Sequence, residues 1–192
     1  MKILFVRHGE SQDDLENRYG GWSDFELTPT GQDQLAETAS RIEQLEEGFE
    51  IILSSPLKRA RSSAEIISSS LKLPVEIFEY VKERNTYGIL SGMEKNEAKL
   101  KYPDQVEHLD SEEYVDGSER IEDLLERIKK ALDLIERRSE KSIVVVTHGV
   151  FLKNLGKVIG KKLVKKEDGG FVLMELANRK LNILKSDGIE FE

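Results

Sequence analysis

Two histidines, each followed by glycine, are the side chains of this sequence best suited to catalysis. His8 follows Arg7 directly after the apolar run Ile3–Val6, and His148 follows a second apolar run at 143–146. Unbroken apolar runs of this kind are typical of central parallel strands that are covered on both faces. Ligands bind at the carboxyl ends of such strands in open α/β sheets. We therefore expect the two imidazole groups to meet in one crevice, although they lie far apart in the sequence.

An arginine and a glutamate lie where further predicted elements begin or end. Arg59 is near the start of a predicted helix, and Glu83 follows a predicted strand. A guanidinium group binds two phosphate oxygens at once, and a neutral imidazole is a competent phosphoryl acceptor near neutral pH. These residue types therefore favour a site for a phosphoryl group. Arg61 is the alternative to Arg59, because helical periodicity leaves both off the buried face, but Arg59 lies nearer the helix N-terminus.

The predicted elements alternate in the order of an α/β protein. The first half has a strand at 3–6, a loop at 11–23, a helix from Thr28-Pro29, a strand at 51–53, a helix from Ser55-Pro56 and a strand at 75–80. The second half has a helix at 121–135 after an Asp116/Glu119 capping box, a strand at 143–147 and a helix at 150–159. Two strands within 170–185, which turn at Asn178-Arg179, end the order. This order predicts a three-layer α/β/α sandwich with a mostly parallel sheet and an antiparallel edge strand. Because no linker or repeat is visible, we expect residues 1–192 to form a single domain, with 84–116 as a short flap over the site.

Composition excludes several classes of function. The chain has 192 residues, 38% hydrophobic and 34% charged, with a net charge of −8 and no cysteine. The acidic balance disfavours nucleic acid and anionic membranes as partners, because both need a basic face. Without cysteine there are no disulfides, thiolate metal sites or cysteine nucleophiles. No apolar stretch approaches the ~20 residues that span a bilayer and no secretory signal is visible, so we expect a cytoplasmic protein.

Four segments together resemble the histidine phosphatase superfamily, also called the phosphoglycerate mutase-like family. They occur in the family's order and span nearly the whole chain: Arg7-His8-Gly9-Glu10-Ser11, Leu27-Thr28-Pro29-Thr30-Gly31, Ser54-Ser55-Pro56-Leu57-Lys58-Arg59-Ala60 and Thr147-His148-Gly149. Arg-His-Gly alone is a weak signal, whereas all four segments together are a strong one.

The resemblance implies a mechanism. His8 attacks phosphorus and becomes phosphohistidine, while Arg7, Arg59 and His148 neutralise charge on the phosphoryl oxygens. Glu83 protonates the leaving oxygen and later deprotonates the attacking water. The resemblance implies no metal ion, because the cationic side chains already supply the positive charge.

Glu83 is the weakest of these assignments. Family members often carry a glycine shortly after the acid, and here Gly88 comes one residue later than that spacing. Glu79 and Glu10 are therefore the alternative acids.

Further residues are assigned to substrate binding by the same resemblance. Many members place an asparagine after the first motif, where this sequence has Asp14, so Asn17 is expected to take its place. Gly117-Ser118 also resembles a segment that lies near the site in the family. The predicted substrate-binding residues are thus Arg7, Arg59, Ser11, Asn17, Ser118 and Gly149.

The predicted function is a metal-independent phosphomonoesterase that acts on a small phosphorylated metabolite. The flap is short and carries an acidic run at 107–116, which disfavours trapping a bisphosphate for return transfer. The alternatives are a cofactor-dependent phosphoglycerate mutase, with 2,3-bisphosphoglycerate as its cofactor, and a non-catalytic phospho-ligand binding module. Sugar phosphates, nucleotides, α-ribazole phosphate and phosphoproteins stay open as substrates. Inorganic phosphate is an expected ligand, and a homodimer is an alternative to a monomer.

Overall fold

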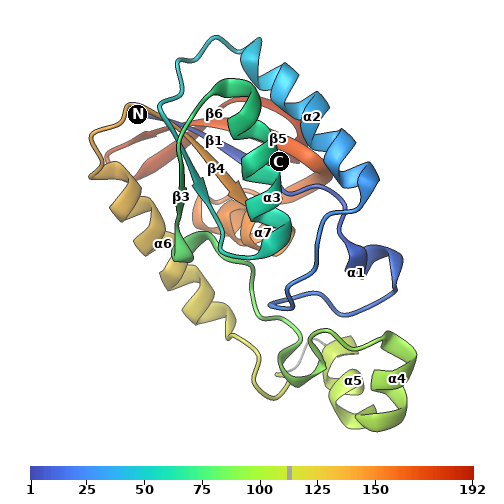
Figure 1. Ribbon diagram of the computed structural model, residues 1–192. Helices are drawn as coiled ribbons and strands as arrows, with labels where there is room; N and C mark the ends of the chain where they lie inside the picture. Colours follow the sequence, from blue (N-terminus) through green and yellow to red (C-terminus); the bar gives the residue numbers. More distant parts are fainter. Residues whose placement is uncertain (112–113) are drawn as a thin grey trace.

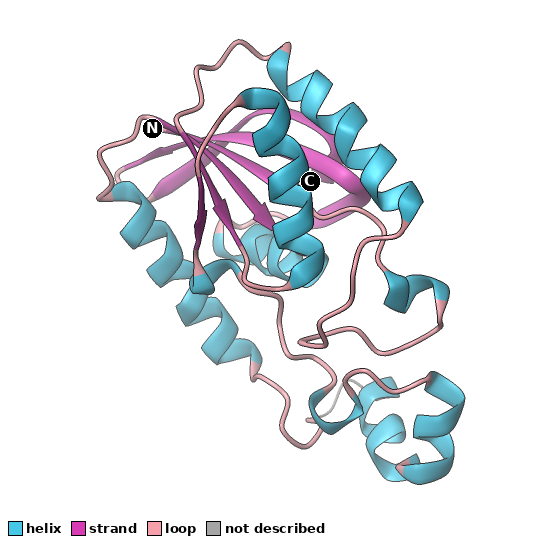
Figure 2. Cartoon of the chain, in the orientation of Figure 1, coloured by secondary structure: helices cyan, strands magenta, loops and turns pink. Residues whose placement is uncertain are grey.

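A computed structural model describes residues 1–111 and 114–192, and its centre is a six-stranded sheet (Figures 1 and 2). The order across the sheet is β3-β2-β4-β1-β5-β6. The first four of these strands run parallel to one another, and β5 pairs antiparallel with both β1 and β6. The strands are β1 (Lys2–Arg7), β2 (Ile51–Ser54), β3 (Val75–Ile77), β4 (Ser142–Thr147), β5 (Leu163–Ala177) and β6 (Lys180–Phe191). The predicted α/β architecture, with antiparallel pairing at one side of the sheet, is confirmed.

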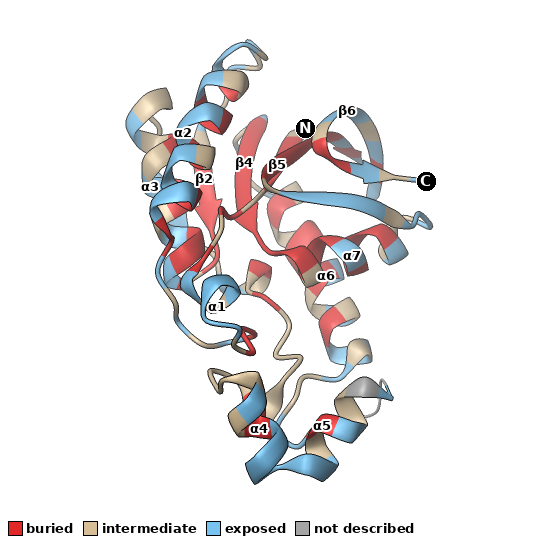
Figure 3. Ribbon diagram, turned by 90° about the vertical axis from the view of Figure 1, so that its right-hand side faces the viewer, coloured by how far each residue is buried: buried red, intermediate tan, exposed pale blue. Residues whose placement is uncertain are grey.

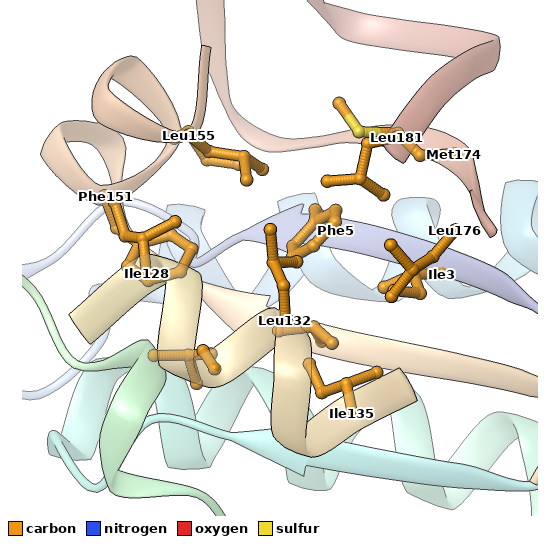
Figure 4. Close-up of a cluster of buried hydrophobic side chains, with 14 of the residues drawn as sticks. Ile3, Phe5, Ile128, Leu132, Ile135, Phe151, Leu155, Met174, Leu176 and Leu181 are labelled. Atoms are coloured by element: carbon orange, nitrogen blue, oxygen red, sulfur yellow. The ribbon is translucent and has the colours of Figure 1, made fainter. Parts of the chain in front are cut away.

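Helices cover both faces of the sheet because successive residues of its strands point to opposite sides. Leu4 and Val6 pack with α2 and α3. Ile3 and Phe5 pack with α6 and α7 on the other face (Figure 4). The burial colours of Figure 3 show the central strands enclosed between these layers. The four helices are α2 (Pro29–Glu43), α3 (Lys58–Leu71), α6 (Ile121–Glu136) and α7 (Gly149–Val158).

Three predicted element boundaries were wrong for local reasons. Helix α3 begins at Lys58 rather than Pro56, because Ser55 still donates its backbone N–H to Val146 at 3.0 Å as an extension of the sheet. The strand at 75–80 stops at Ile77, and a 3-10 turn, η1 (Glu79–Val81), follows it. The segment 11–23 is not all loop, since it contains the short helix α1 (Gln12–Leu15).

Two further boundaries also differ from the sequence prediction. Helix α6 begins after Arg120 without the expected capping box, because Glu119 pairs with Arg127 instead. The last two strands are longer than the predicted 170–185. They do turn at Asn178 and Arg179, whose φ values of 52° and 60° suit the tight turn of a two-residue hairpin.

The flap segment carries its own small hydrophobic cluster. It contains η2 (Gly88–Leu90), α4 (Lys95–Lys101) and α5 (Pro103–Asp110), and its buried side chains include Leu90, Ala98 and Val106. Tyr19 joins this cluster from the segment before α2, and its backbone N–H donates to the Met93 carbonyl at 3.0 Å. Part of the predicted acidic run, residues 112–113, lies outside the described residues. No helix in the described ranges is both long and apolar enough to cross a bilayer.

Candidate active site

The register of β1 and β4 brings the two histidines side by side. Arg7 pairs with Thr147, so His8 and His148 are the next residues on two adjacent parallel strands. The His8 backbone N–H extends the ladder by donating to the Thr147 carbonyl at 3.1 Å. The centroids of the two imidazole rings lie 4.9 Å apart, with 59° between the ring planes. The convergence expected from the sequence is therefore present.

His8 is held as a neutral imidazole with one nitrogen facing a cation. Its Nδ1 lies 2.7 Å from the Gly9 carbonyl oxygen, which only accepts hydrogen bonds, so Nδ1 carries the ring proton. Its Nε2 accepts from Arg59 Nε at 3.3 Å. Burial lowers the pKa of His8 well below its usual value, and the charges of Arg59 and Arg7 lower it further. The Nε2 lone pair is therefore unprotonated at neutral pH.

Arg59 is buried and ties the segment before α2 to the site. Its Nη1 and Nη2 donate to the carbonyls of Ser23 and Gly21, both at 2.9 Å. Burial lowers the pKa of Arg59, and the nearby carboxylate of Glu83 opposes that shift. Arg61 is exposed on the outer face of the same helix. Of the two arginines left open by periodicity, Arg59 is the one at the site.

His148 is wholly buried and has one anchored nitrogen. Its Nε2 lies 2.7 Å from the hydroxyl of Ser55, whereas its Nδ1 has no hydrogen-bond partner among the described residues. Burial lowers the pKa of His148 well below its usual value, with Arg59 the next cause. From the sequence, Ser55 is expected only at the start of a helix. Its place one residue beyond β2, beside β4, is what directs its hydroxyl to His148.

Arg7 is oriented by the β5 strand. Its Nη2 forms an ion pair with Asp168 at 2.8 Å, and its Nη1 donates to the Lys166 carbonyl at 2.7 Å. Its Nε is buried without a hydrogen-bond partner in the described part of the chain. Sequence reasoning missed both β5 residues, because the strand was expected to begin only at 170.

Glu83 lies at the N-terminus of α7. Its carboxylate accepts from the backbone N–H groups of Val150 at 3.1 Å, Phe151 at 3.0 Å and Arg84 at 2.8 Å. These three donors fix the orientation of the carboxyl group and give its oxygens partners in the buried site.

The two alternative acids are placed elsewhere. Glu10 accepts a hydrogen bond from the Thr28 hydroxyl at 2.6 Å, and Glu79 is exposed in η1. Glu83 lines the cavity beside His8, and neither alternative does.

Arg127 of α6 fastens the segment that carries Glu83. Its guanidinium donates to the carbonyls of Tyr80 at 3.0 Å, Lys82 at 2.7 Å and Glu83 at 3.2 Å, and it pairs with Glu119 at 2.8 Å. Arg127 was not expected at the site, because no signal in the sequence points to this function.

A cavity of about 220 Å³ opens beside His8, whereas the fully buried His148 lies behind His8 and does not line it. Among the predicted residues it is lined by Arg7, His8, Ser11, Arg59, Glu83 and Gly149. It is also lined by charged residues that sequence reasoning did not assign to substrate: Asp13, Asp14, Arg18, Lys95 and Lys166. Sheet-like contacts between 17–19 and 92–95 bring the flap residue Lys95 to the cavity.

Two predicted substrate-binding residues do not line the cavity. Asn17 is exposed, with a φ of 51°, and its carbonyl accepts from the Lys95 N–H at 3.1 Å. Ser118 donates its backbone N–H to Val115 at 2.9 Å. Ser11 does line the cavity, but its hydroxyl donates to Asp13 at 2.6 Å. Within the described residues, no group of three His, Asp or Glu side chains is placed to hold a metal ion.

Comparison with known proteins agrees with this geometry. A sequence model of the histidine phosphatase superfamily (branch 1) matches residues 3–192. The chain belongs to this superfamily. It is 32% identical over 154 residues to the uncharacterized phosphatase PhoE of Bacillus subtilis, an alignment covering 80% of this chain and 74% of that protein. It is 33% identical over 162 residues to a 2,3-bisphosphoglycerate-dependent phosphoglycerate mutase of Cytophaga hutchinsonii, with the same coverage.

Solved structures share the fold of this chain. The α-ribazole phosphatase of Shigella flexneri aligns with a TM-score of 0.82 at 19% identity, covering 96% of this chain and 95% of that one. Bacillus stearothermophilus YhfR gives a TM-score of 0.82 at 24% identity, covering 95% and 94%. A mycobacterial glucosyl-3-phosphoglycerate phosphatase gives 0.78 at 19% identity, covering 95% and 96%.

Proposed function

We propose that this protein is a metal-independent phosphomonoesterase that works through a phosphohistidine on His8. The observation that carries the proposal is the state of that imidazole: its proton is on Nδ1, its pKa is lowered, and its Nε2 faces Arg59 at 3.3 Å. A neutral imidazole whose unprotonated nitrogen faces a guanidinium can act as a nucleophile and forms part of an anion site. An ordinary structural histidine would need neither feature.

The first step is in-line attack of His8 Nε2 on phosphorus, with cleavage of the bond to the ester oxygen. As the phosphoryl group moves to nitrogen, Arg7 and Arg59 neutralise its non-bridging oxygens. Glu83 enters this step as the carboxylic acid and gives its proton to the departing alkoxide, so the alcohol leaves neutral and the three backbone N–H groups hold the carboxylate that forms. In the second step Glu83 takes a proton from water, the water oxygen bonds to phosphorus, and the bond to Nε2 breaks to release phosphate.

In this scheme His148 donates a hydrogen bond to the phosphoryl group. We assign the Ser55 hydroxyl as the donor to His148 Nε2, which lies 2.7 Å away, while the hydroxyl oxygen accepts the Leu57 N–H at 3.3 Å. The neutral imidazole then carries its own proton on Nδ1, the nitrogen that lacks a partner among the described residues. We assign this N–H to a phosphoryl oxygen, since a buried donor without a partner is costly unless a ligand accepts from it.

A small phosphorylated metabolite fits the site better than a folded phosphoprotein. The cavity has a volume of about 220 Å³, and the flap residue Lys95 stands at its rim. The names of the structural neighbours given above, α-ribazole phosphatase and glucosyl-3-phosphoglycerate phosphatase, also refer to small phosphate esters. The need for no added metal or cofactor, the cytoplasmic location and the homodimer alternative stay predictions from the sequence.

Phosphate release from p-nitrophenyl phosphate and from a panel of phosphorylated metabolites tests the proposal. The metal-chelated wild-type protein should release phosphate, and His8→Ala should lose that activity while keeping the wild-type unfolding curve. Failure to release phosphate from any ester while still binding inorganic phosphate would instead favour a non-catalytic binding module.

A phosphoglycerate mutase is the second candidate, favoured by the 33% identity to the Cytophaga hutchinsonii mutase. Incubation with 3-phosphoglycerate and catalytic 2,3-bisphosphoglycerate separates the two activities. The phosphatase proposal predicts that free phosphate appears from phosphate esters and that 2-phosphoglycerate forms slowly or not at all. Rapid formation of 2-phosphoglycerate without free phosphate would replace the phosphatase by the mutase.

A further inference from the structure

Two consecutive lysines of β5 have different surroundings. The Lys165 amine forms ion pairs with Glu167 at 3.0 Å and Glu190 at 3.7 Å. Lys166 instead lines the cavity that contains His8. Because neighbouring strand residues point to opposite faces, one lysine is directed to the paired surface and the other to the site. The two lysines are chemically identical, but only Lys166 is placed to contact a ligand in the cavity.

The Lys166 amine and the Arg7 guanidinium meet over Gly149. A Cβ built on Gly149 would lie 3.2 Å from Lys166 Nζ and 3.4 Å from Arg7 Nε. The absence of a side chain at Gly149 is what lets the two cationic groups approach this point, at the start of α7. Arg7 Nε, the nitrogen on this side, has no hydrogen-bond partner in the described part of the chain.

No described carboxylate neutralises Lys166. Asp168 is engaged by Arg7 at 2.8 Å, and Glu83 is engaged by the N–H groups at the start of α7. Lys166 is exposed at the cavity, and partial loss of solvent around its amine lowers its pKa, as does the charge of Arg7, while Glu83 and Asp168 oppose the shift. Two cations packed together without an anion between them repel each other, and an anion placed between them removes that repulsion.

We propose that Lys166 is a phosphate-binding residue, whose Nζ acts with Arg7 Nε on a non-bridging oxygen of the substrate's phosphoryl group. This assignment rests on the proposed function, and it adds a cation that the family resemblance did not supply. It also assigns a function to the first part of β5. Residues 163–169 were not predicted as strand, and they carry both Lys166 and Asp168.

The test compares Lys166→Gln with Lys165→Gln, which removes the same charge one residue away. Inorganic phosphate is titrated calorimetrically into each protein, and kcat and KM are measured with p-nitrophenyl phosphate. Loss of one charge-assisted hydrogen bond should weaken phosphate binding and lower kcat/KM by about 10-fold or more in Lys166→Gln. Lys165→Gln should stay within about 2-fold of wild type, because an exposed ion pair contributes little. Lys166→Arg should recover part of the binding.

Stability separates an anion site from a structural lysine. The side chain of Lys166 has no ion pair with any described residue, so phosphate-free Lys166→Gln should unfold at the same urea concentration as wild type, or at a higher one once the repulsion by Arg7 is gone. Phosphate should then stabilise wild type more than the variant. A variant that is less stable without phosphate, or that binds phosphate as Lys165→Gln does, would overturn the assignment.

The same measurements keep this proposal distinct from the proposed function. If wild type turns over esters and Lys166→Gln does so equally well, the phosphatase stands and the lysine assignment fails. If wild type binds phosphate, Lys166→Gln binds it weakly and neither turns over esters, the assignment stands and the phosphatase fails. Absence of phosphate binding by wild type would count against both.

Discussion

The imidazole rings of His8 and His148 lie 4.9 Å apart between centroids, although the two residues are far apart in the sequence. Their contact follows from one feature of the sheet, the parallel pairing of β1 with β4, in which Arg7 is opposite Thr147. A shift of the register by one residue would separate the rings and turn one of them away from the crevice. The catalytic proposal therefore depends on backbone pairing as much as on the side chains.

Arg59 should tolerate no substitution, because it makes three directed hydrogen bonds. Lysine at this position keeps the charge but cannot reach His8 and both carbonyls at once. We expect Arg59→Lys to lower kcat/KM by about 100-fold, the effect of losing a bidentate oxyanion donor. Arg61→Lys is the matched control on the outer face of α3 and should remain near wild type. Equal activity of the two variants would contradict this account of the site.

Ser55 should contribute to stability as well as to turnover. Ser55→Ala removes the partner of His148 Nε2 at 2.7 Å and leaves a buried ring nitrogen unpaired. The free energy of unfolding should fall by about 1–3 kcal/mol, and kcat should fall because His148 loses its fixed tautomer. Ser69→Ala, an exposed serine on α3, is the control for urea unfolding and should change little. A fully stable and active Ser55→Ala protein would show that His148 needs no anchor.

Much of the fold could be predicted because the central strands are unbroken apolar runs in the sequence. The apolar runs at 3–6 and 143–146 are typical of buried strands, and the glycines after His8 and His148 mark where these strands end. The wrong element boundaries occur where a tertiary contact overrides the local sequence pattern. Ser55-Pro56 has the pattern of a helix start, yet Ser55 is held in the sheet by the Val146 carbonyl, which delays the helix to Lys58.

The missed site residues share a physical cause. Lys166 and Asp168 are charged residues in a charged stretch, so hydrophobic periodicity gives no sign that β5 passes the site. Arg127 occupies an off-core helical position whose partners, the carbonyls of Tyr80 and Lys82, leave no trace in side-chain patterns. A single sequence does not predict contacts between a side chain and a distant backbone group, whereas it does predict where many strands end and helices begin.

Two buried neutral imidazoles should make the protein less stable in acid. Burial lowers the pKa of His8 and His148 well below the usual value. As the pH falls through about 6.5, the unfolded chain binds protons at these residues and the folded chain does not, so unfolding is favoured. Each histidine should lower the free energy of unfolding by up to about 1.4 kcal/mol per pH unit until its folded pKa is reached.

Urea unfolding across this pH range measures the effect. His148→Gln removes one of the two titrating groups, so its stability should depend less steeply on pH than that of wild type. A wild-type stability that stays constant from about pH 7 to about pH 5.5 would mean that the imidazoles are protonated as readily in the folded protein as in the unfolded chain.

Arg127 should affect turnover without touching substrate. Arg127→Met removes the donors that hold the carbonyls of Lys82 and Glu83, so the acid is no longer fixed at the cavity. We expect kcat to fall more than KM rises, together with a loss of about 2 kcal/mol in the free energy of unfolding. Lys129→Met, an exposed cation on the same helix, is the control. If Arg127→Met loses stability but keeps the wild-type kcat, Arg127 serves the fold alone and does not position Glu83.

The most direct test of the central claim is to trap the phosphoryl group on the protein. Wild-type enzyme is mixed with a phosphate ester, quenched in base after a fraction of one turnover, and its peptides are analysed by mass. The account predicts the mass of one phosphoryl group on the peptide that contains His8, and none in His8→Ala. A phosphoryl group on another residue, or steady turnover by His8→Ala, would contradict it.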